Sequence, residues 1–86
     1  MNEVEVFKAL GDPTRLKILK SVHHGEKCIC EIVPSTGKSQ PNVSQHLKVL
    51  KNAGLIHERK EGTNIFVLAA HKDVFQIIDI VKRMKE

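Results

Sequence analysis

Aromatic side chains and long apolar runs are scarce in this sequence. Its 86 residues include no Trp, no Tyr and only three Phe. A protein that binds single-stranded nucleic acid by stacking bases on aromatic rings is therefore not expected. The longest apolar run, 65–70, is too short for a membrane span or an export signal. We therefore expect a cytoplasmic protein that has no membrane partner.

Cysteine is also scarce, and it is confined to one place. Cys28 and Cys30 are the only two, which is too few for a disulfide framework. In the reducing cytoplasm, such a close pair indicates a metal-binding or redox-active site rather than a structural bridge. The sequence has no recognisable nucleophile–base pair, phosphate-binding glycine loop or carboxylate pair, so we do not expect an enzyme.

The length predicts a single domain over residues 1–86 with a small core. Short domains bury a smaller fraction of their surface than long ones, so we expect oligomerisation to add stability. The last predicted helix supports this expectation, because its apolar arc is wider than one core contact needs. The residues of that arc are Val74, Phe75, Ile77, Ile78, Ile80, Val81 and Met84.

The positive charge is concentrated in the middle of the chain. The whole sequence has a formal net charge of +4, and residues 38–64 carry five basic and two acidic side chains. Such a segment suits a polyanion-binding surface. The alternative is a solvated face with no partner.

Hydrophobic periodicity and capping residues predict five helices and one hairpin. The helices run over 3–10, from the Asp12 cap to 23–25, over 28–36, from the Ser39 cap to 52–54, and over about 74–84. Because Pro34 falls inside the third helix, that helix must be short or irregular. Strands at 55–60 and 65–68 flank a turn at 61–64. The predicted fold is mainly α with a β-hairpin wing, a winged helix-turn-helix.

The second helix of a helix-turn-helix unit enters the major groove of duplex DNA and reads base edges. Polar side chains that can do so here are Ser39, Gln40, Asn42, Ser44, Gln45 and His46. The cations placed for phosphates are Lys38, Lys48, Lys51, Arg59 and Lys60, and Thr63 and Asn64 add wing contacts. The alternative is a solvated polar helix whose Asn and Gln side chains serve as caps.

Five segments in order resemble the ArsR/SmtB family of small metal-sensing repressors of bacteria and archaea. They are ALGDPTRLKIL at 9–19, CICEI at 28–32, SQPNVSQHL at 39–47, LKNAGLI at 50–56 and RKEGT at 59–63. The resemblance implies a homodimer joined through its terminal helices. It also implies that two recognition helices bind an imperfect palindrome of operator DNA, and that an effector releases it. His46 stands where the family commonly has His, which favours DNA contact over metal binding.

Cys28 and Cys30 stand where arsenic-sensing members of the family carry their Cys-x-Cys box. Thiolates favour thiophilic ions such as As(III). Residues i and i+2 of an α-helix point about 200° apart, so both could hold one ion only if the helix start distorted. Binding would then pull on the third helix, which Gly37 connects to the recognition helix. Val33 replaces the third Cys of many arsenic sensors, so an external thiol or water would complete the site.

Other roles for the cysteine pair, and for the fold, stay open. The pair could be a thiol redox or persulfide switch, or two small hydrophobic residues left from an ancestral sensor. The winged helix could also serve only protein–protein contact. No obligatory cofactor is expected, and we expect no metal site at His71 and Asp73, because no second His follows at the family's spacing.

Overall fold

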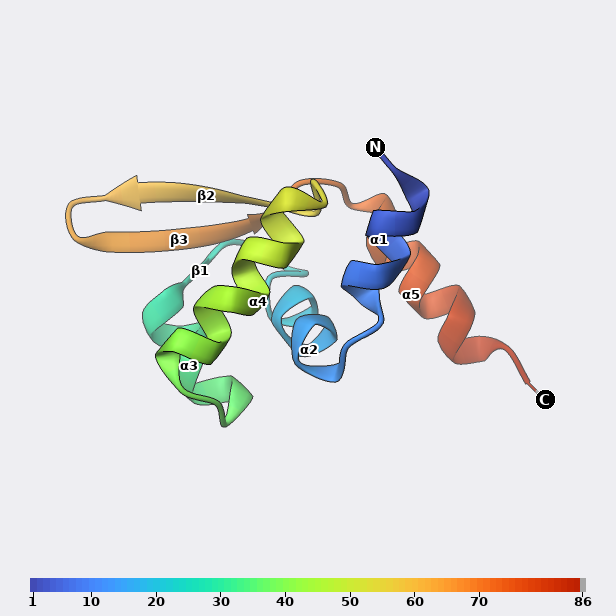
Figure 1. Cartoon of the computed structure of the whole chain (residues 1–86), viewed down its shortest axis with the longest axis horizontal. Coiled ribbons are helices and arrows are strands. Elements are labelled where there is room, and N and C mark those ends of the chain that lie inside the picture. Colours follow the sequence, from blue (N-terminus) through green and yellow to red (C-terminus); the bar gives the residue numbers. More distant parts are fainter. Residues whose placement is uncertain (86) are drawn as a thin grey trace.

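The computed structural model describes residues 1–85, which form five helices and a three-stranded antiparallel sheet (Figure 1). In chain order the elements are α1 Glu3–Leu10, α2 Pro13–Ser21, β1 Lys27–Cys28, α3 Ile29–Thr36, α4 Gln40–Asn52, β2 Ile56–Glu61, β3 Asn64–Ala69 and α5 Asp73–Arg83. The predicted fold class, mainly α with a β-hairpin wing, is confirmed. No helix within residues 1–85 has the length and apolarity that crossing a membrane requires.

The molecule is elongated, measuring 45 × 26 × 22 Å along its principal axes. The wing formed by β2 and β3 projects at one end, and α1 and α5 lie together at the other (Figure 1). Between these ends α2, α3 and α4 pack around the core. The side chains of the core without measurable exposure are Ile18, Leu19, Val43, Leu50 and Val67.

Capping residues explain where two of the helices begin. The carboxylate of Asp12 accepts hydrogen bonds from the backbone N–H groups of Thr14 (2.9 Å) and Arg15 (3.0 Å), and Pro13 opens α2. The hydroxyl of Ser39 accepts from the backbone N–H of Asn42 at 3.3 Å. These side chains satisfy N–H groups that have no partner within the helix.

The turn between α3 and α4 depends on Gly37. Its φ of 70° lies in the left-handed region, which glycine adopts without steric cost. Pro34 is accommodated inside α3, which is only eight residues long. The short helix that the sequence predicted is therefore present.

The sequence did not predict β1. This two-residue strand pairs antiparallel with β3, with Lys27 opposite Val67 and Cys28 opposite Phe66. A strand so short has no alternation to detect. The sequence predicted that this helix begins at Cys28. Because Cys28 ends β1, α3 begins at Ile29 instead. Cys28 is therefore the N-cap of the helix and lies outside it.

The two terminal helices expose apolar side chains. On α1, Val4 is 58% and Phe7 61% exposed; on α5, Ile80 is 53% and Val81 59% exposed. Both helices also reach the core, α1 through Ala9 and Leu10 and α5 through Val74 and Phe75. Each terminal helix therefore carries apolar side chains that are not covered within the subunit.

The Asp12 cap makes stability depend on pH. The N–H of Arg15 donates to this carboxylate and, with the nearby positive charges of His46 and Arg15, lowers the pKa of Asp12 despite partial burial. A group whose pKa is lowered by folding adds stability above its unfolded pKa and loses it as the pH falls through the folded pKa.

We expect Asp12→Ala to lower the free energy of unfolding by about 1 kcal/mol at neutral pH, because the cap is lost. Asp12→Asn is the matched control, since it keeps a capping oxygen and removes only the charge. Urea unfolding should show a wild-type advantage over Asp12→Asn at neutral pH that disappears in acid. An advantage that is independent of pH would contradict the role of the charge.

Candidate nucleic-acid interface and cysteine site

Helix α4 presents a polar outer face. Val43, Leu47 and Leu50 hold its inner side in the core. Because these positions recur every three to four residues, the remaining ones point outward. The exposed side chains that the sequence singled out on and just before this helix are Lys38, Ser39, Gln40, Asn42, Ser44, Gln45 and Lys48. They are free of the core and available to a ligand.

His46 lies differently from the other predicted base-reading residues. It is about 200° around α4 from Ser44, and its side chain is only 19% exposed. Its Nδ1 is 3.2 Å from Nη1 of Arg15 and 3.8 Å from Oδ2 of Asp12. The imidazole therefore faces the start of α2 rather than the outer face of α4.

Arg15 joins three helices through one guanidinium group. Besides its contact with His46 on α4, it donates from Nε to the carbonyl of Ala9 at 2.7 Å and from Nη2 to that of Lys8 at 3.2 Å. These carbonyls belong to the last turn of α1, where helix carbonyls lack intrahelical partners, and that of Lys8 also accepts the backbone N–H of Gly11 at 3.2 Å. The sequence does not indicate this role, because a single Arg on an amphipathic helix normally marks only the solvated face of that helix.

The charge of the wing is partly neutralised within the molecule. Arg59 donates to Glu26 at 2.6 and 3.2 Å and to Glu61 at 2.6 Å, and its guanidinium lies 4.6 Å from the ring centre of Phe66. The hydrogen bond from Arg59 lowers the pKa of Glu26 and raises the pKa of Arg59 itself. Lys51 likewise pairs with Glu58 at 3.1 Å.

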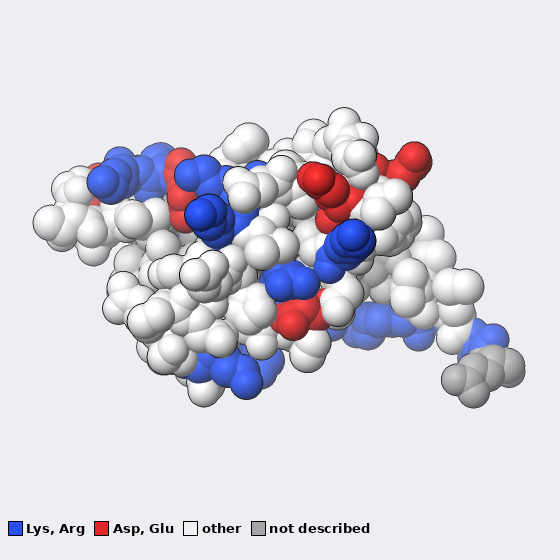
Figure 2. Space-filling model, in the orientation of Figure 1, with Lys and Arg blue, Asp and Glu red and all other residues white. Residues whose placement is uncertain are grey.

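Three lysines of the basic segment remain without an ion-pair partner among residues 1–85, namely Lys38, Lys48 and Lys60. Figure 2 shows basic side chains along the wing and near the turn between α3 and α4, with a largely uncharged surface between them over the first turns of α4. Thr63 and Asn64, at the tip of the wing, are exposed. Cations thus flank a polar, neutral face.

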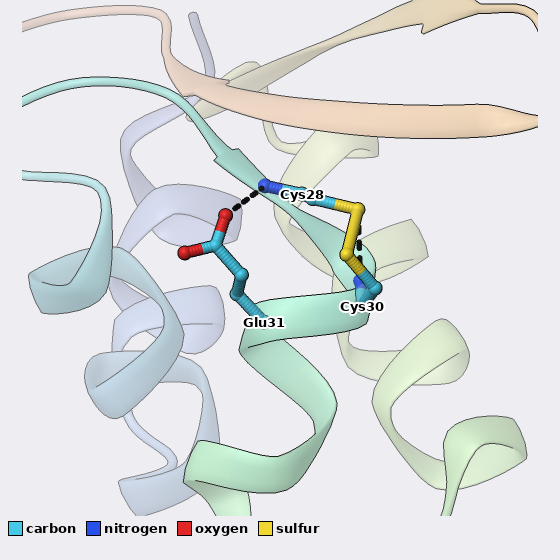
Figure 3. Close-up of a disulfide and its surroundings, with 3 residues drawn as sticks. All are labelled: Cys28, Cys30 and Glu31. Carbon is cyan, nitrogen blue, oxygen red and sulfur yellow. Dashed lines mark hydrogen bonds between the residues drawn. A yellow bond between two sulfur atoms is a disulfide. The ribbon is translucent and has the colours of Figure 1, made fainter.

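The two cysteines meet at the start of α3 (Figure 3). Cys28 approaches from β1 and is 6% exposed, whereas Cys30 lies in the first turn of the helix and is exposed. Their sulfur atoms point toward each other and form a disulfide. The backbone N–H of Cys30 donates to Sγ of Cys28 at 3.1 Å, and the N–H of Cys28 donates to Oε1 of Glu31 at 3.4 Å.

The prediction that helix geometry separates these two sulfurs is wrong. It assumed that both cysteines belong to the helix, but Cys28 is extended (φ −66°, ψ 143°) and precedes it. Its side chain therefore turns back toward Cys30 without any distortion of α3. Two sulfur ligands can face the same ion or the same reactant in the undistorted fold.

Once their disulfide is reduced, Cys28 and Cys30 offer a thiophilic ion two thiolate ligands. Within residues 1–85, no group of three or more His, Cys, Asp or Glu side chains is arranged to hold a metal. Glu31, the nearest carboxylate in sequence, already accepts the hydrogen bond of the Cys28 amide. The donor set fits a soft ion that takes its remaining ligand from solution, and it does not fit structural zinc, which takes four ligands.

A groove of about 400 Å³ opens beside the cysteine pair. Besides Cys28 and Cys30, it is lined by Gln40 and Ser44 of α4 and by Thr63 and Asn64 at the wing. The floor is apolar and includes Ile29, Val33, Pro34 and Ile65. The sequence predicted a connection between the cysteines and α4 only through Gly37; the groove adds a direct one.

Relatives of this chain are transcriptional regulators. It is 46% identical over 81 residues to an HTH-type transcriptional regulator of Methanocaldococcus jannaschii, covering 93% of this chain and 91% of that protein. It is 40% identical over 60 residues to the arsenical resistance operon repressor of Escherichia coli, covering 69% of this chain but only 51% of that repressor. The chain thus spans about half the length of the latter.

Solved structures share the fold. HlyU from Vibrio cholerae superposes with a TM-score of 0.84 at 31% identity, covering 94% of this chain and 88% of HlyU. A homodimeric winged helix-turn-helix DNA-binding domain from Mycobacterium bovis gives 0.82 at 34% identity, covering 92% and 73%. Residues 12–58 match the family model described as bacterial regulatory protein, arsR family. With this match over most of its length and these relatives, the chain belongs to the ArsR family of transcriptional regulators, which are DNA-binding proteins and not enzymes.

Proposed function

We propose that this repressor of the ArsR family binds operator DNA as a homodimer and leaves it when an effector acts at Cys28 and Cys30. The observation that carries the proposal is the groove that places both sulfurs beside Gln40 and Ser44 of α4 and beside the tip of the wing. A ligand at the cysteines therefore touches the elements that read DNA. Such a protein works in the cytoplasm, and residues 1–86 act as one DNA-binding domain.

In the proposed complex, α4 lies in the major groove and the wing lies along the backbone. The exposed amides and hydroxyls of α4 and its cap read base edges. Lys38, Lys48 and Lys60 bind phosphates, because no carboxylate of residues 1–85 pairs with them. Arg59 and Lys51 contribute only if a phosphate displaces their carboxylate partners. His46 acts indirectly, by fixing the orientation of α4 through Arg15.

The proposed dimer covers the exposed apolar faces of α1 and α5. Val4, Phe7, Ile80 and Val81 supply apolar surface of the kind that subunit interfaces bury. The similar domain from Mycobacterium bovis is homodimeric. A two-fold dimer presents two copies of α4, so the operator we propose is an imperfect palindrome.

The proposed effector is a thiophilic metalloid or soft metal ion, As(III) foremost. The name of the similar Escherichia coli repressor refers to arsenical resistance, and that of a Staphylococcus aureus relative to cadmium resistance. The reduced sulfurs of Cys28 and Cys30 would hold the ion, and a thiol or water from solution would complete its coordination.

A thiol redox or persulfide switch is the second candidate, favoured by a specific observation. The two sulfurs lie close enough to form a disulfide without rearranging the helix start. Oxidation would then be the signal, and the fold would need no metal. A third reading, a winged helix used only for protein–protein contact, predicts no salt-dependent affinity for duplex DNA.

The roles of Gln45 and Lys48 can be separated on sequences selected from random duplexes. Gln45→Ala should relax the sequence preference, with a loss of about 1–3 kcal/mol on the preferred site only. Lys48→Ala should weaken binding to all sequences alike and reduce the salt slope by about 1. Fluorescence anisotropy over a salt series measures both effects. Equal effects of the two changes on every duplex would contradict the assignment.

Charge on the outer face of α5 should dissociate the dimer. Ile80→Glu places a carboxylate in the proposed interface, so sedimentation should show a shift toward monomer and operator affinity should fall. Lys82→Glu, on another side of the same helix, is the matched control and should leave the dimer intact. A dimer that tolerates Ile80→Glu would place the interface elsewhere.

Titration of the operator complex distinguishes the two effectors. Under reducing conditions, As(III) or Cd(II) should release wild-type protein and should fail to release Cys30→Ser. If release follows oxidation instead and is blocked by Cys30→Ser, the redox reading holds. A Cys28→Ser, Cys30→Ser double variant that responds as wild type does would overturn both.

A further inference from the structure

Cys28 and Cys30 are chemically unequal, although they are only two positions apart. Both cysteines line the groove, but Cys28 is buried at the end of β1 and Cys30 is exposed. Cys30 is therefore the more accessible of the two residues to a reagent from solution. Access to the attacked sulfur is one of the factors that govern thiol–disulfide exchange.

The sulfur of Cys28 is placed to act as the leaving group. As the N-cap of α3, it accepts the backbone N–H of Cys30 at 3.1 Å and lies at the positive end of the helix dipole. Both interactions favour a negatively charged sulfur. A thiolate stabilised in this way leaves a disulfide faster than an ordinary one.

We infer that Cys30 is a thiolation site: a low-molecular-weight thiol forms a mixed disulfide with it and places its polar tail in the groove. This inference rests on the proposed function, and it names the reactant class and the reacting sulfur of the same site. The volume of about 400 Å³ falls within the range of small-molecule pockets. The polar groups of Gln40, Ser44, Thr63 and Asn64 give the tail hydrogen-bonding partners.

The step is a balanced exchange of one disulfide for another. The thiolate of the small molecule attacks Sγ of Cys30 and forms a new S–S bond. The bond between Cys28 and Cys30 breaks, and its electron pair leaves on Sγ of Cys28 as a thiolate. No external oxidant is needed, and attack by Cys28 on the adduct reverses the step.

The adduct acts on DNA binding by occupying shared space. Gln40 and Ser44 line the groove and also belong to the exposed face of α4. A tail that lies against them covers part of that face and of the wing tip. Release of DNA should therefore depend on the size of the adduct, whereas a switch that works only by opening the disulfide would not.

The site is tested by adding glutathione to the oxidised wild-type protein, quenching with acid, alkylating free thiols and mapping peptides by mass spectrometry. We expect glutathione on Cys30 and the alkyl group on Cys28. Predominant modification of Cys28 would overturn the inference.

The consequence is tested with Cys28→Ser, which keeps a capping residue and cannot reverse the adduct. Three forms are compared on the selected duplex: unmodified, methylthiolated at Cys30, and glutathionylated at Cys30, each checked for an unchanged melting profile. We expect the glutathione adduct to bind the duplex at least about tenfold more weakly than the unmodified form does. The methylthio adduct should bind it as tightly as the unmodified form.

Equal weakening by both adducts, or none by either, would overturn the shared-groove explanation. If the unmodified variant and reduced wild type both lack salt-dependent affinity for duplex DNA, the proposed function fails instead. The expected effect of the adduct on DNA affinity would then fail together with the proposed function. The peptide map would still decide independently whether Cys30 is the reacting sulfur.

Discussion

The placement of Cys28 outside the helix is the constraint on which the cysteine site depends. Backbone pairing of Lys27 and Cys28 with β3 keeps Cys28 extended until α3 begins. Its side chain then acts as the N-cap of α3 and does not take the direction that a residue within the helix would give it. One two-residue strand therefore brings two sulfurs together, buries one of them and leaves the other facing the groove. It also attaches the cysteine site to the strand that carries the wing.

The recognition helix is held from two flanks by different chemistry. On one flank Nη1 of Arg15 lies 3.2 Å from Nδ1 of His46, and Oδ2 of Asp12 lies 3.8 Å from the same nitrogen. On the other flank Gln40 and Ser44 border the groove at the cysteines. The outer face between these flanks is left polar and exposed. The first flank is a fixed contact within the protein, and the second is open to a reactant from solution.

Local signals in the sequence predicted the helices, the hairpin and the exposed face of α4. Asp12, Ser39 and Gly37 act at short range, so their roles follow from residue type and position. The contacts that were missed join distant parts of the chain: Cys28 with Phe66, Arg15 with His46, and Arg59 with Glu26. No periodicity encodes such pairings. For this reason only three of the five basic side chains of segment 38–64 lack a carboxylate partner among residues 1–85.

The bridge that Arg15 forms has a geometric consequence for the proposed dimer. It ties the last turn of α1, a helix of the proposed interface, to the helix that enters the major groove. In the proposed dimer, rotation of a subunit about the interface would then carry its α4 with it, so the interface acts as the pivot. Sites one helical turn apart on DNA lie about 34 Å from each other. Rotation at such a pivot, with no change inside either subunit, would alter the distance between the two α4 helices and so their fit to successive major grooves.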